Sequence, residues 1–303
     1  MSAGPPGGAQ LGDVLDRIPV GVLIHRETGI VYANQEGAQL LVGPGRSPLG
    51  RNLLEFVEPA ERAALETAFL DCLHGGVPVR TMDVTLLGPG AGPDGHPIRT
   101  QVSMAPLPWD GPAVAYVVVT DVTTLKENED RLQVLAITDP LTGLFNRRHF
   151  MELAESELNR SRRYGGQVSL LSVDIDHFKH INDAFGHAIG DRALKAFADG
   201  CRSMLRTNDI FGRIGGEEFA ILLPETGADA ARAAAERLRE TIAGLRVPAG
   251  RRTIHFTISA GVSSCRDGDR TLDALLSSAD KALYRAKHGG RNRVVVAADT
   301  PAP

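Results

Sequence analysis

The chain has 303 residues, of which 33 are lysine or arginine and 37 are aspartate or glutamate, so its formal net charge is -4. This length predicts two domains, each able to bury its own core, and the lack of a basic excess argues against nucleic-acid binding. The sequence contains no run of about 18 apolar residues, and residues 1–10 lack a basic and an apolar segment. We therefore expect no signal peptide, no membrane span and a cytoplasmic location.

The N-terminal part of the chain, after a Gly- and Pro-rich start at 1–10 that we expect to be disordered, alternates short strands and helices. Two strands are predicted, followed by a short helix that ends at Gly43 and a longer amphipathic helix with Leu65, Phe69 and Leu73 on one face. Three more strands complete this region. The predicted strands lie at 20–25, 30–34, 82–86, 102–104 and 113–120, with a wide loop at 88–97.

This order of two strands, short helices and three antiparallel strands resembles a PAS sensor domain. The resemblance is carried by IVYANQEGAQLLVG and by the triplet Asp121-Val122-Thr123, which is similar to the triplet that joins PAS domains to their outputs. It implies a PAS-like antiparallel sheet with short helices over residues 11–123.

The ligand of this sensor domain is not identified by the sequence. A haem or metal role needs a histidine aimed into the cleft, and the candidates are His25, His74 and His96. His74 has the most suitable position, at the end of the long helix, but a histidine there also complements the helix dipole. No cysteine stands in a flavin-reactive motif.

A linker helix is predicted at 124–138. Leu125, Asn128, Leu132 and Leu135 follow alternating spacings of three and four, which gives one apolar stripe interrupted by a polar residue. Such a helix can couple two chains when a flanking domain also pairs, and the polar position fixes its register. A plain rigid spacer remains the alternative.

The C-terminal region, 139–298, predicts a β-α-β-β-α-β order with an added helix and strand, so the whole protein is an α/β (α+β) chain. A turn-rich segment opens a helix to about residue 163, and a buried strand and a short helix and loop follow. The remaining predicted elements are a helix at 192–204, a hairpin at 211–224, a helix at 228–245, a strand at 253–264, a helix at 272–287 and a strand at 293–296.

The hairpin at 211–224 carries two acids directly after two glycines. Gly215-Gly216 are predicted to supply the positive φ that a tight turn needs. Glu217 and Glu218 then lie at the tip, where burial and mutual repulsion raise carboxylate pKa values unless a cation lies opposite. By itself, the motif also fits a solvated surface hairpin.

A second acidic segment, Asp174-Ile175-Asp176, ends the predicted buried strand. In a β-α-β-β-α-β sheet this end neighbours the hairpin tip, so Asp174 and Glu217 are expected to converge. Such a pair suits Mg²⁺, which takes few protein carboxylates, keeps water and bridges substrate phosphates. An EF-hand loop is excluded because it needs glycine where Lys179 stands, and Asp176 is expected to cap the following helix.

Four segments together resemble the GGDEF diguanylate cyclases, over about 165 residues. They are DPLTGLFNRR, DIDHFKHINDAFGHAIGD, RIGGEEF (the GGEEF variant of the signature) and ADKALYRAKHGGRNRV. The resemblance implies a palm-like cyclase domain at 139–298 that makes cyclic di-GMP from two GTP molecules.

The resemblance implies a metal site and a catalytic group. Asp174, the backbone carbonyl of Ile175 and Glu217 match the ligands of Mg²⁺, with Mn²⁺ as an alternative ion. Glu217 also helps to deprotonate the attacking 3′-hydroxyl, and Glu218 supports a second metal ion. Lys179 matches a residue that neutralises phosphate charge in the transition state.

The resemblance also implies phosphate-binding residues. Gly215 and Gly216 let the backbone approach the phosphates closely. Lys287 and Arg291, interpreted as one helical turn apart, reach the β- and γ-phosphates. These two cations also complement a helix C-terminus before the next glycines.

For the base, Asn182 and Asp191 match the pair that hydrogen-bonds the guanine edge, and His187 and Phe178 join them in the substrate pocket. A carboxylate at 191 accepts hydrogen bonds from the N1–H and amino group of guanine, which adenine does not offer, so GTP is favoured over ATP.

One such domain holds one GTP and half of the catalytic apparatus, so the resemblance implies a homodimer in which each 3′-hydroxyl attacks the other α-phosphate. The PAS-like domain and the linker helix would then regulate synthesis through the dimer arrangement.

A product-inhibition site is implied by Arg206-Thr207-Asn208-Asp209, which matches the RxxD motif of the family. Arg206 and Asp209 would bind cyclic di-GMP with Arg237 as a partner. Without that family context, the segment is only a helix end followed by a turn.

Three functions stay open from the sequence. The first is an active, PAS-regulated and product-inhibited cyclase, and the second is a catalytically silent cyclic di-GMP receptor. The third is a nucleotidyl cyclase with another product, for which a different residue would be expected in place of Asp191.

Overall fold

The computed structural model describes residues 13–75, 80–87, 97–107, 113–250, 252–266 and 271–297. By its internal contacts, the chain divides into two compact units, Met1–Arg131 and Leu132–Pro303. The predicted disordered start, the tail at 299–303 and His96 with most of its loop lie outside the described residues.

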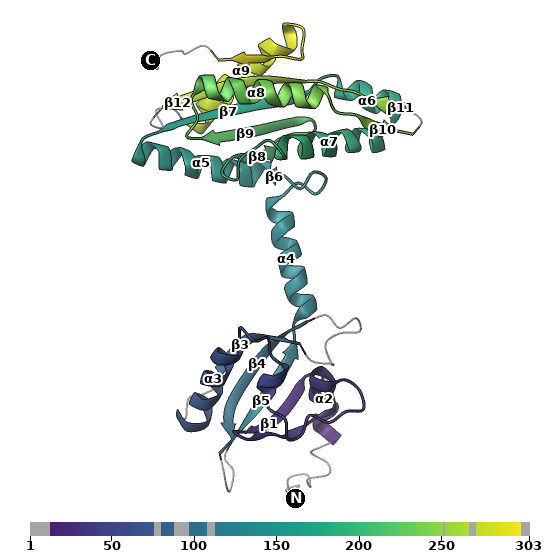
Figure 1. The fold of residues 1–303 in the computed structure, drawn as a ribbon, viewed down its shortest axis with the longest axis vertical. Coiled ribbons are helices and arrows are strands. Elements are labelled where there is room, and N and C mark those ends of the chain that lie inside the picture. Colours follow the sequence, from purple (N-terminus) through teal and green to yellow (C-terminus); the bar gives the residue numbers. More distant parts are fainter. Residues whose placement is uncertain are drawn as a thin grey trace, which may run out of the picture. The chain divides into compact units, whose positions relative to one another are not determined.

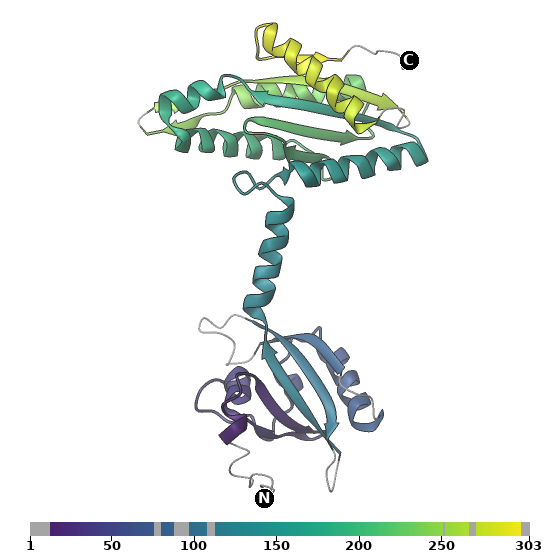
Figure 2. The same cartoon turned by 180° about the vertical axis from the view of Figure 1, so that it is seen from behind.

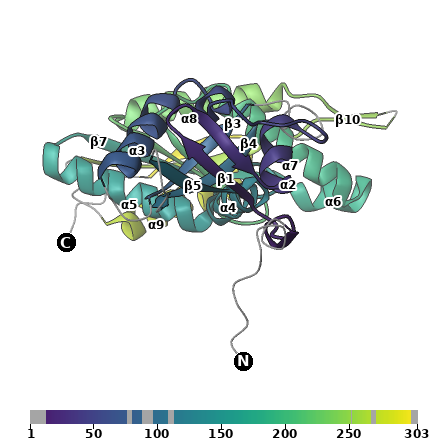
Figure 3. The same ribbon diagram turned by 90° about the horizontal axis from the view of Figure 1, so that it is seen from below.

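The first unit contains a five-stranded antiparallel sheet in the order β2-β1-β5-β4-β3 (Figure 1). Figure 3 shows its strands β1, β5 and β4 side by side. This is the predicted arrangement of two strands, short helices and three strands. Its elements are β1 Gly21–Arg26, β2 Gly29–Ala33, α2 Gln35–Val42, the 3₁₀ helix η1 Leu53–Phe56, α3 Arg62–Gly75, β3 Arg80–Leu86, β4 Ile98–Leu107 and β5 Val114–Asp121.

Asn34 organises the start of this unit. Its side-chain oxygen accepts from the backbone N–H of Gly37, which caps α2, and from that of Val22 in β1, at 2.9 and 2.7 Å. Its amide donates to the carbonyls of Leu15 and Val20, both at 2.9 Å. One buried side chain therefore satisfies four backbone groups, and α2 ends at Gly43 as predicted, where φ is 81°.

The helix α4, Thr123–Ile137, is the predicted linker. Leu125, Leu132 and Leu135 of its apolar stripe are 57%, 66% and 49% exposed. Exposed leucines at this spacing form an apolar helix face that the described residues of the chain leave uncovered.

The second unit is built on a six-stranded mixed sheet in the order β13-β12-β7-β9-β8-β6. Each of its four central strands, β12, β7, β9 and β8, is antiparallel to its neighbour, and the four correspond to the predicted β-α-β-β-α-β core. The strands are β6 Phe145–Asn146, β7 Gln167–Ile175, β8 Ile210–Arg213, β9 Glu218–Pro224, β12 Ile258–Arg266 and β13 Val294–Val296.

Both faces of this sheet are covered by helices (Figures 1 and 2). Leu171 and Val173 of β7 lie in a cluster with α7 and α8, whereas Leu170 lies in a cluster with α5 and α9. β7 is buried along nearly its whole length, with the small polar residues Ser169 and Ser172 among its apolar ones, as expected for a strand covered by helices on both faces. The helices are α5 Arg147–Tyr164, α6 Phe178–Phe185, α7 His187–Arg202, α8 Ala228–Ala243 and α9 Leu272–His288.

Three details differ from the sequence prediction. The two-residue strand β6 pairs with β8 inside the segment read as a turn. The helix α7 begins at His187 rather than at 192, and the strand predicted at 253–264 is split into β11, Arg252–Ile254, and β12, with β11 paired to β10, Val247–Ala249. The strands β6, β10 and β11 have only two or three residues, and elements this short carry little periodic signal in a sequence.

Candidate active site

The end of β7 lies beside the tip of the β8–β9 hairpin. β7 and β9 are antiparallel neighbours, with Asp174 opposite Glu218, and the N–H of Ile175 donates to the carbonyl of Glu217 at 3.4 Å. The structure therefore brings the predicted metal-binding residues of β7 to the hairpin that carries Glu217, as the topology required.

These carboxylates share an electrostatically strained environment. Asp174 is 3% exposed, and burial raises its pKa to about 6 against the opposing effect of Lys287, whose Nζ lies 2.6 Å from Oδ2, while Glu217 and Glu218 add to the rise. Burial also raises the pKa of Glu217, which Lys287 opposes and Glu218 reinforces. The site holds more negative charge than Lys287 alone compensates.

Asp174, Glu217 and the carbonyl of Ile175 fit a Mg²⁺ ion as a partial set of ligands. Within the described residues, no three acidic, histidine or cysteine side chains are grouped closely enough to hold a metal by themselves. Mg²⁺ is commonly held by one or two carboxylates, with water and substrate phosphates completing its shell. The carboxylate oxygens of Asp174 and Glu217 and the carbonyl oxygen of Ile175 are the type of ligand that this ion prefers.

The two glycines of the hairpin tip do not have the positive φ that the sequence suggested. Neither is among the positive-φ glycines, and the connection from Arg213 to Glu218 is a four-residue loop closed by Ile214 N–H to Glu218 O at 2.8 Å. A Cβ on Gly215 would lie 2.5 Å from the Glu218 carboxylate, whereas Gly216 has nothing within 4 Å of its Cβ position. Glycine at 215 lets the Glu218 carboxylate lie against the backbone of the tip, and Gly216 leaves open space in front of it.

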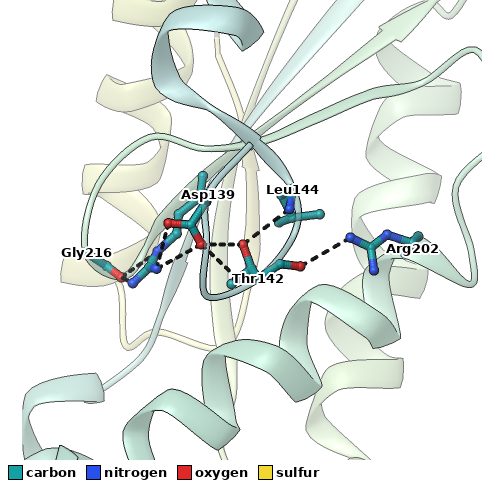
Figure 4. Close-up of polar contacts among 6 residues, drawn as sticks. Asp139, Thr142, Leu144, Arg202 and Gly216 are labelled. Atoms are coloured by element: carbon teal, nitrogen blue, oxygen red, sulfur yellow. Dashed lines mark hydrogen bonds and ion pairs between the residues drawn. The ribbon is translucent and has the colours of Figure 1, made fainter. Parts of the chain in front are cut away.

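A network of polar contacts fixes the hairpin tip to the segment before α5 (Figure 4). The guanidinium of Arg213 donates to both oxygens of Asp139 at 3.1 Å and to the carbonyl of Gly216 at 2.6 and 3.2 Å. Burial alone would raise the pKa of Asp139, but hydrogen bonds from Thr142 and Arg213 outweigh it and hold the pKa below its ordinary value. An ionised Asp139 therefore orients Arg213, which orients the tip.

The turn that contains Asp139 is itself anchored. Thr142 donates to Asp139 through its backbone N–H at 2.8 Å and its hydroxyl at 2.7 Å, and Arg202 of α7 donates to the carbonyl of Thr142 at 3.3 Å (Figure 4). The carbonyl of Ala136, in the last turn of α4, accepts from the side chains of Asn146 and Arg148 at 2.9 and 2.7 Å. Sequence reasoning used this segment only as a family signature and missed its contacts.

The predicted guanine-binding residues come from α6 and α7. Asn182 lies against Gly190, because a Cβ at 190 would approach its amide oxygen to 1.9 Å, and Asp191 follows directly on the exposed side of α7. Gly190 was not singled out from the sequence, yet its missing side chain is what allows Asn182 to pack against α7, one residue before Asp191. Of the remaining predicted substrate residues, Lys179 and His187 are exposed, whereas Phe178 is 7% exposed and belongs to the core.

The predicted phosphate-binding cations are arranged differently from the expectation. Lys287 is in the last turn of α9, which ends at His288, but Arg291 lies beyond the helix with φ of 58°. The interpretation that the two are one helical turn apart is therefore wrong. Arg291 belongs to a tight turn in left-handed backbone conformation, a geometry that costs energy for a non-glycine residue.

Asp176 does not cap α6, contrary to the sequence prediction. The N-cap position is His177, whose side chain makes no capping hydrogen bond. The carboxylate of Asp176 turns away and accepts from Thr257 and Ser259 hydroxyls, both at 2.7 Å, and from the N–H of Asn292 at 2.9 Å.

A groove of about 750 Å³ runs from the hairpin between α5 and α9, with Glu218 and Lys287 among its lining residues. This volume is in the range of small-molecule sites. The predicted guanine-binding residues on α6 and α7 do not line it.

Arg206, Asp209 and Arg237 line one cavity of about 110 Å³. The N–H of Arg206 donates to the Asp209 carboxylate at 2.8 Å, so the RxxD segment is a closed turn, and Arg237 reaches the same cavity from α8. The structure thus brings together the three residues of the predicted product-binding site.

Of the two described histidines in the first unit, His25 lies next to a cavity and His74 is exposed. His25 lines a cavity of about 110 Å³ with Phe69 and Met104. Its Nε2 accepts from the N–H of Leu53 at 3.0 Å and its Nδ1 lies 2.5 Å from the carbonyl of Arg26. Both ring nitrogens are already engaged, which leaves neither for a haem iron.

Comparison with known proteins agrees with this geometry. Residues 136–293 match the family model described as diguanylate cyclase, GGDEF domain, and residues 15–127 match a PAS fold. The chain belongs to the GGDEF family. Both predicted resemblances are confirmed.

The chain is 47% identical over 169 residues to diguanylate cyclase DgcP of Pseudomonas aeruginosa, covering 56% of this chain and 25% of that protein. It is 44% identical over 173 residues to the response regulator PleD of Caulobacter vibrioides, covering 56% of this chain and 38% of that protein. The chain therefore spans less than half of the length of either relative.

Among solved structures, the coiled coil and GGDEF domain of DgcB from Caulobacter crescentus, in complex with c-di-GMP, superposes with a TM-score of 0.55 at 30% identity. The match covers 58% of this chain and 93% of that one. No helix in the described part of this chain combines the length and hydropathy that a bilayer crossing requires.

Proposed function

We propose that this protein is a diguanylate cyclase that condenses two GTP molecules into cyclic di-GMP and releases two pyrophosphates. The observation that carries the proposal is the buried Asp174 at the end of β7, held beside Glu217, Glu218 and Lys287. In a chain of the GGDEF family, this is the charge arrangement expected for an ion and a triphosphate.

Asp174, Glu217 and the carbonyl of Ile175 would hold Mg²⁺, or Mn²⁺ as an alternative. The ion, when bound, neutralises phosphate charge and polarises the phosphorus that is attacked. Glu217 takes the proton of the 3′-hydroxyl as a general base, a role that its place at the hairpin tip beside the end of β7 supports. The 3′-oxygen then bonds to the α-phosphorus of the second GTP, and the bond to the β-phosphate oxygen breaks.

The cations around the triphosphate would be Lys179, Lys287 and Arg291. Lys287 already lies against Asp174 from the last turn of α9, and Arg291 is presented on the turn that follows. Preorganised positive charge of this kind stabilises the charge that develops on the leaving pyrophosphate. Gly216 leaves room for phosphate at the hairpin tip.

Selectivity for GTP would come from Asn182 and Asp191. Asn182 packs against Gly190, which directly precedes Asp191 in α7, and this arrangement supports a paired contact with one base edge. The carboxylate of Asp191 accepts from guanine N1–H and the amino group, and adenine leaves it without those donors.

We infer that two chains act together, because one cyclase domain carries one GTP. The exposed leucines of α4, at 125, 132 and 135, support pairing of this helix with a second copy. The PAS-like unit would then control synthesis by changing how two cyclase domains meet.

The product would bind at Arg206, Asp209 and Arg237 and slow the enzyme. An arginine fork recognises phosphate and guanine in two-pronged contacts, and the cavity that these three residues line supports the assignment. The same cavity would also serve a catalytically silent cyclic di-GMP receptor, which is the second candidate function.

The test is incubation of the purified chain with GTP or ATP, with MgCl₂ or with EDTA, followed by ion-exchange chromatography. We expect cyclic di-GMP and two equivalents of pyrophosphate from GTP with Mg²⁺ alone. Binding of cyclic di-GMP without turnover would select the receptor, and a cyclic product from ATP would contradict the role of Asp191.

A further inference from the structure

Asp176 is a buried carboxylate that the proposed mechanism leaves without a role. It is 4% exposed, and the ion pairs of the described residues do not include it. Burying a charge is costly unless hydrogen bonds replace its water. The arrangement of those hydrogen bonds therefore indicates what the carboxylate is for.

The hydrogen bonds of Asp176 join three parts of the site. Its own N–H donates to the carbonyl of Thr257 at 2.9 Å, and its Oδ1 accepts from Ser259 at 2.7 Å, which fixes it to the segment entering β12. Its Oδ2 accepts from the Thr257 hydroxyl at 2.7 Å and from the N–H of Asn292 at 2.9 Å. Asp176 directly follows the proposed metal-binding residues of β7, so it links that strand end to the turn after α9.

That turn is unusual in its backbone. Arg291 and Asn292 are consecutive non-glycine residues with positive φ, 58° and 45°. Such conformations persist only where the surroundings hold them. Here the N–H of Asn292 is held from inside by Asp176, and its side-chain oxygen accepts from Arg239 of α8 at 3.0 Å on the outside.

We infer that Asp176 is a positioning residue: it holds the Arg291–Asn292 turn against the end of β7 and so sets where the Arg291 guanidinium meets a triphosphate. This inference rests on the proposed function, because it takes the β- and γ-phosphates of GTP as the partner of Arg291. A buried carboxylate suits the task because it accepts three hydrogen bonds at once.

The inference predicts different effects on two ligands that both contain guanine but differ in their phosphates. An α,β-methylene analogue of GTP carries the β- and γ-phosphates and cannot release pyrophosphate, whereas GMP lacks them. We expect Asp176→Ala to weaken binding of the analogue about tenfold, the size of one charge-assisted contact, and to change GMP binding less than about twofold. Calorimetric titration of the full chain with MgCl₂ measures both.

Two controls distinguish positioning from general destabilisation. Asp176→Asn keeps an oxygen for Thr257 and Asn292, while the Ser259 hydroxyl can rotate to accept, so we expect near wild-type affinity. Asp176→Ala added to Arg291→Ala should cost nothing further for the analogue, because the two residues act through one contact. A full additional loss, or an equal loss for GMP, would overturn the inference.

Two substitutions at one surface residue, Asn292, test the role of the turn even if Asp176→Ala does not fold. Asn292 is exposed, and both Asn292→Ala and Asn292→Gly remove its contact with Arg239. Only alanine is strained at φ of 45°, so we expect Asn292→Ala to weaken the analogue by several-fold more than Asn292→Gly, with GMP unchanged. Equal behaviour of the two variants would contradict the inference.

The same titrations keep the inference apart from the proposed activity. A wild-type chain that binds the analogue, shows this pattern and still forms no cyclic di-GMP would refute the cyclase proposal and leave the role of Asp176 intact. A wild-type chain that binds neither ligand would refute both.

Discussion

The two units of the chain bury polar groups for different purposes. In the first unit, the side chains of Asn34 and Thr100 form hydrogen bonds with backbone groups, and both ring nitrogens of His25 also contact the backbone. In the second unit, Asp174 and Asp176 are carboxylates buried at the end of one strand. Neutral groups closed on the backbone hold a fold together, whereas a buried acid beside further acids stores electrostatic energy that a cation can release.

The largest effect we expect is on Glu217. Glu217→Ala removes a proposed metal ligand and base, so synthesis of cyclic di-GMP should fall by about 10³-fold or more. Because the residue is at a hairpin tip, the melting temperature should stay close to that of the wild type. Glu155→Ala, at an exposed position of α5, is the matched control and should keep full activity. Retained synthesis in Glu217→Ala would refute the metal assignment.

A pH titration of stability sharpens the comparison between the units. The pKa of Asp174 is raised to about 6 in the fold from 3.8, so the folded chain binds more protons than the unfolded chain between these values. Stability without divalent ions should therefore fall as pH rises through this window, by up to about 3 kcal/mol. Asp174→Asn should flatten the slope in urea unfolding with EDTA. An unchanged slope would show that Asp174 is not strained.

The next effect concerns the hairpin support. Arg213→Ala breaks the contacts with Asp139 and the Gly216 carbonyl, so the tip loses its fixed position and kcat should fall about tenfold to thirtyfold. Arg202→Ala, which loses a carbonyl contact with Thr142 at 3.3 Å and an exposed ion pair with Asp199, should have a smaller effect on kcat. Full activity of Arg213→Ala in initial-rate assays would show that the contacts of Arg213 with Asp139 and Gly216 do not contribute to catalysis.

A smaller effect is expected at the product cavity. Arg206→Ala should leave the initial rate unchanged and raise product accumulation late in the reaction by several-fold, because inhibition by cyclic di-GMP is lost. Arg232→Ala, exposed on the same helix as Arg237, should behave as the wild type. Identical late time courses for Arg206→Ala and wild type would eliminate the inhibitory site.

The smallest effect we expect is a pH dependence of stability in the first unit, which comes from His25. Burial lowers the pKa of His25, against the contact with the Arg26 carbonyl, so the unfolded chain binds the proton more readily. The stability of this unit should therefore be complete above the ordinary pKa of 6.5 and decline as pH falls below it, opposite in sign to Asp174. His25→Gln should remove this dependence in calorimetric scans of the full chain. A decline that persists would assign it to another group.

The approach of Asp174 to the hairpin could be predicted because it follows from topology alone. An apolar strand ending in acids and a hairpin with acids at its tip must meet if the two strands pair, and β7 pairs with β9 in that register. The fold of both units was predictable for the same reason: strand order and helix periodicity are written in local patterns.

What escaped prediction depends on partners that are distant in sequence. Asp176 was expected to cap the next helix. Its oxygens instead accept hydrogen bonds from the hydroxyls of residues 257 and 259 and from the N–H of residue 292. Likewise, nothing near Asp139 indicates that Arg213 will bind it. Local preference is a weak guide where tertiary hydrogen bonds offer a buried carboxylate more donors.

The hydrogen bonds from Asn146 and Arg148 to the Ala136 carbonyl fix the rotation of the last turn of α4 about the helix axis. Removing one residue upstream of it turns every preceding side chain by about 100° around the helix axis. A seven-residue change returns the leucine face to within about 20° of its original direction. For α4 paired with a second copy through this face, as proposed, a seven-residue insertion should preserve the pairing, whereas a one-residue insertion should turn the leucines away from it.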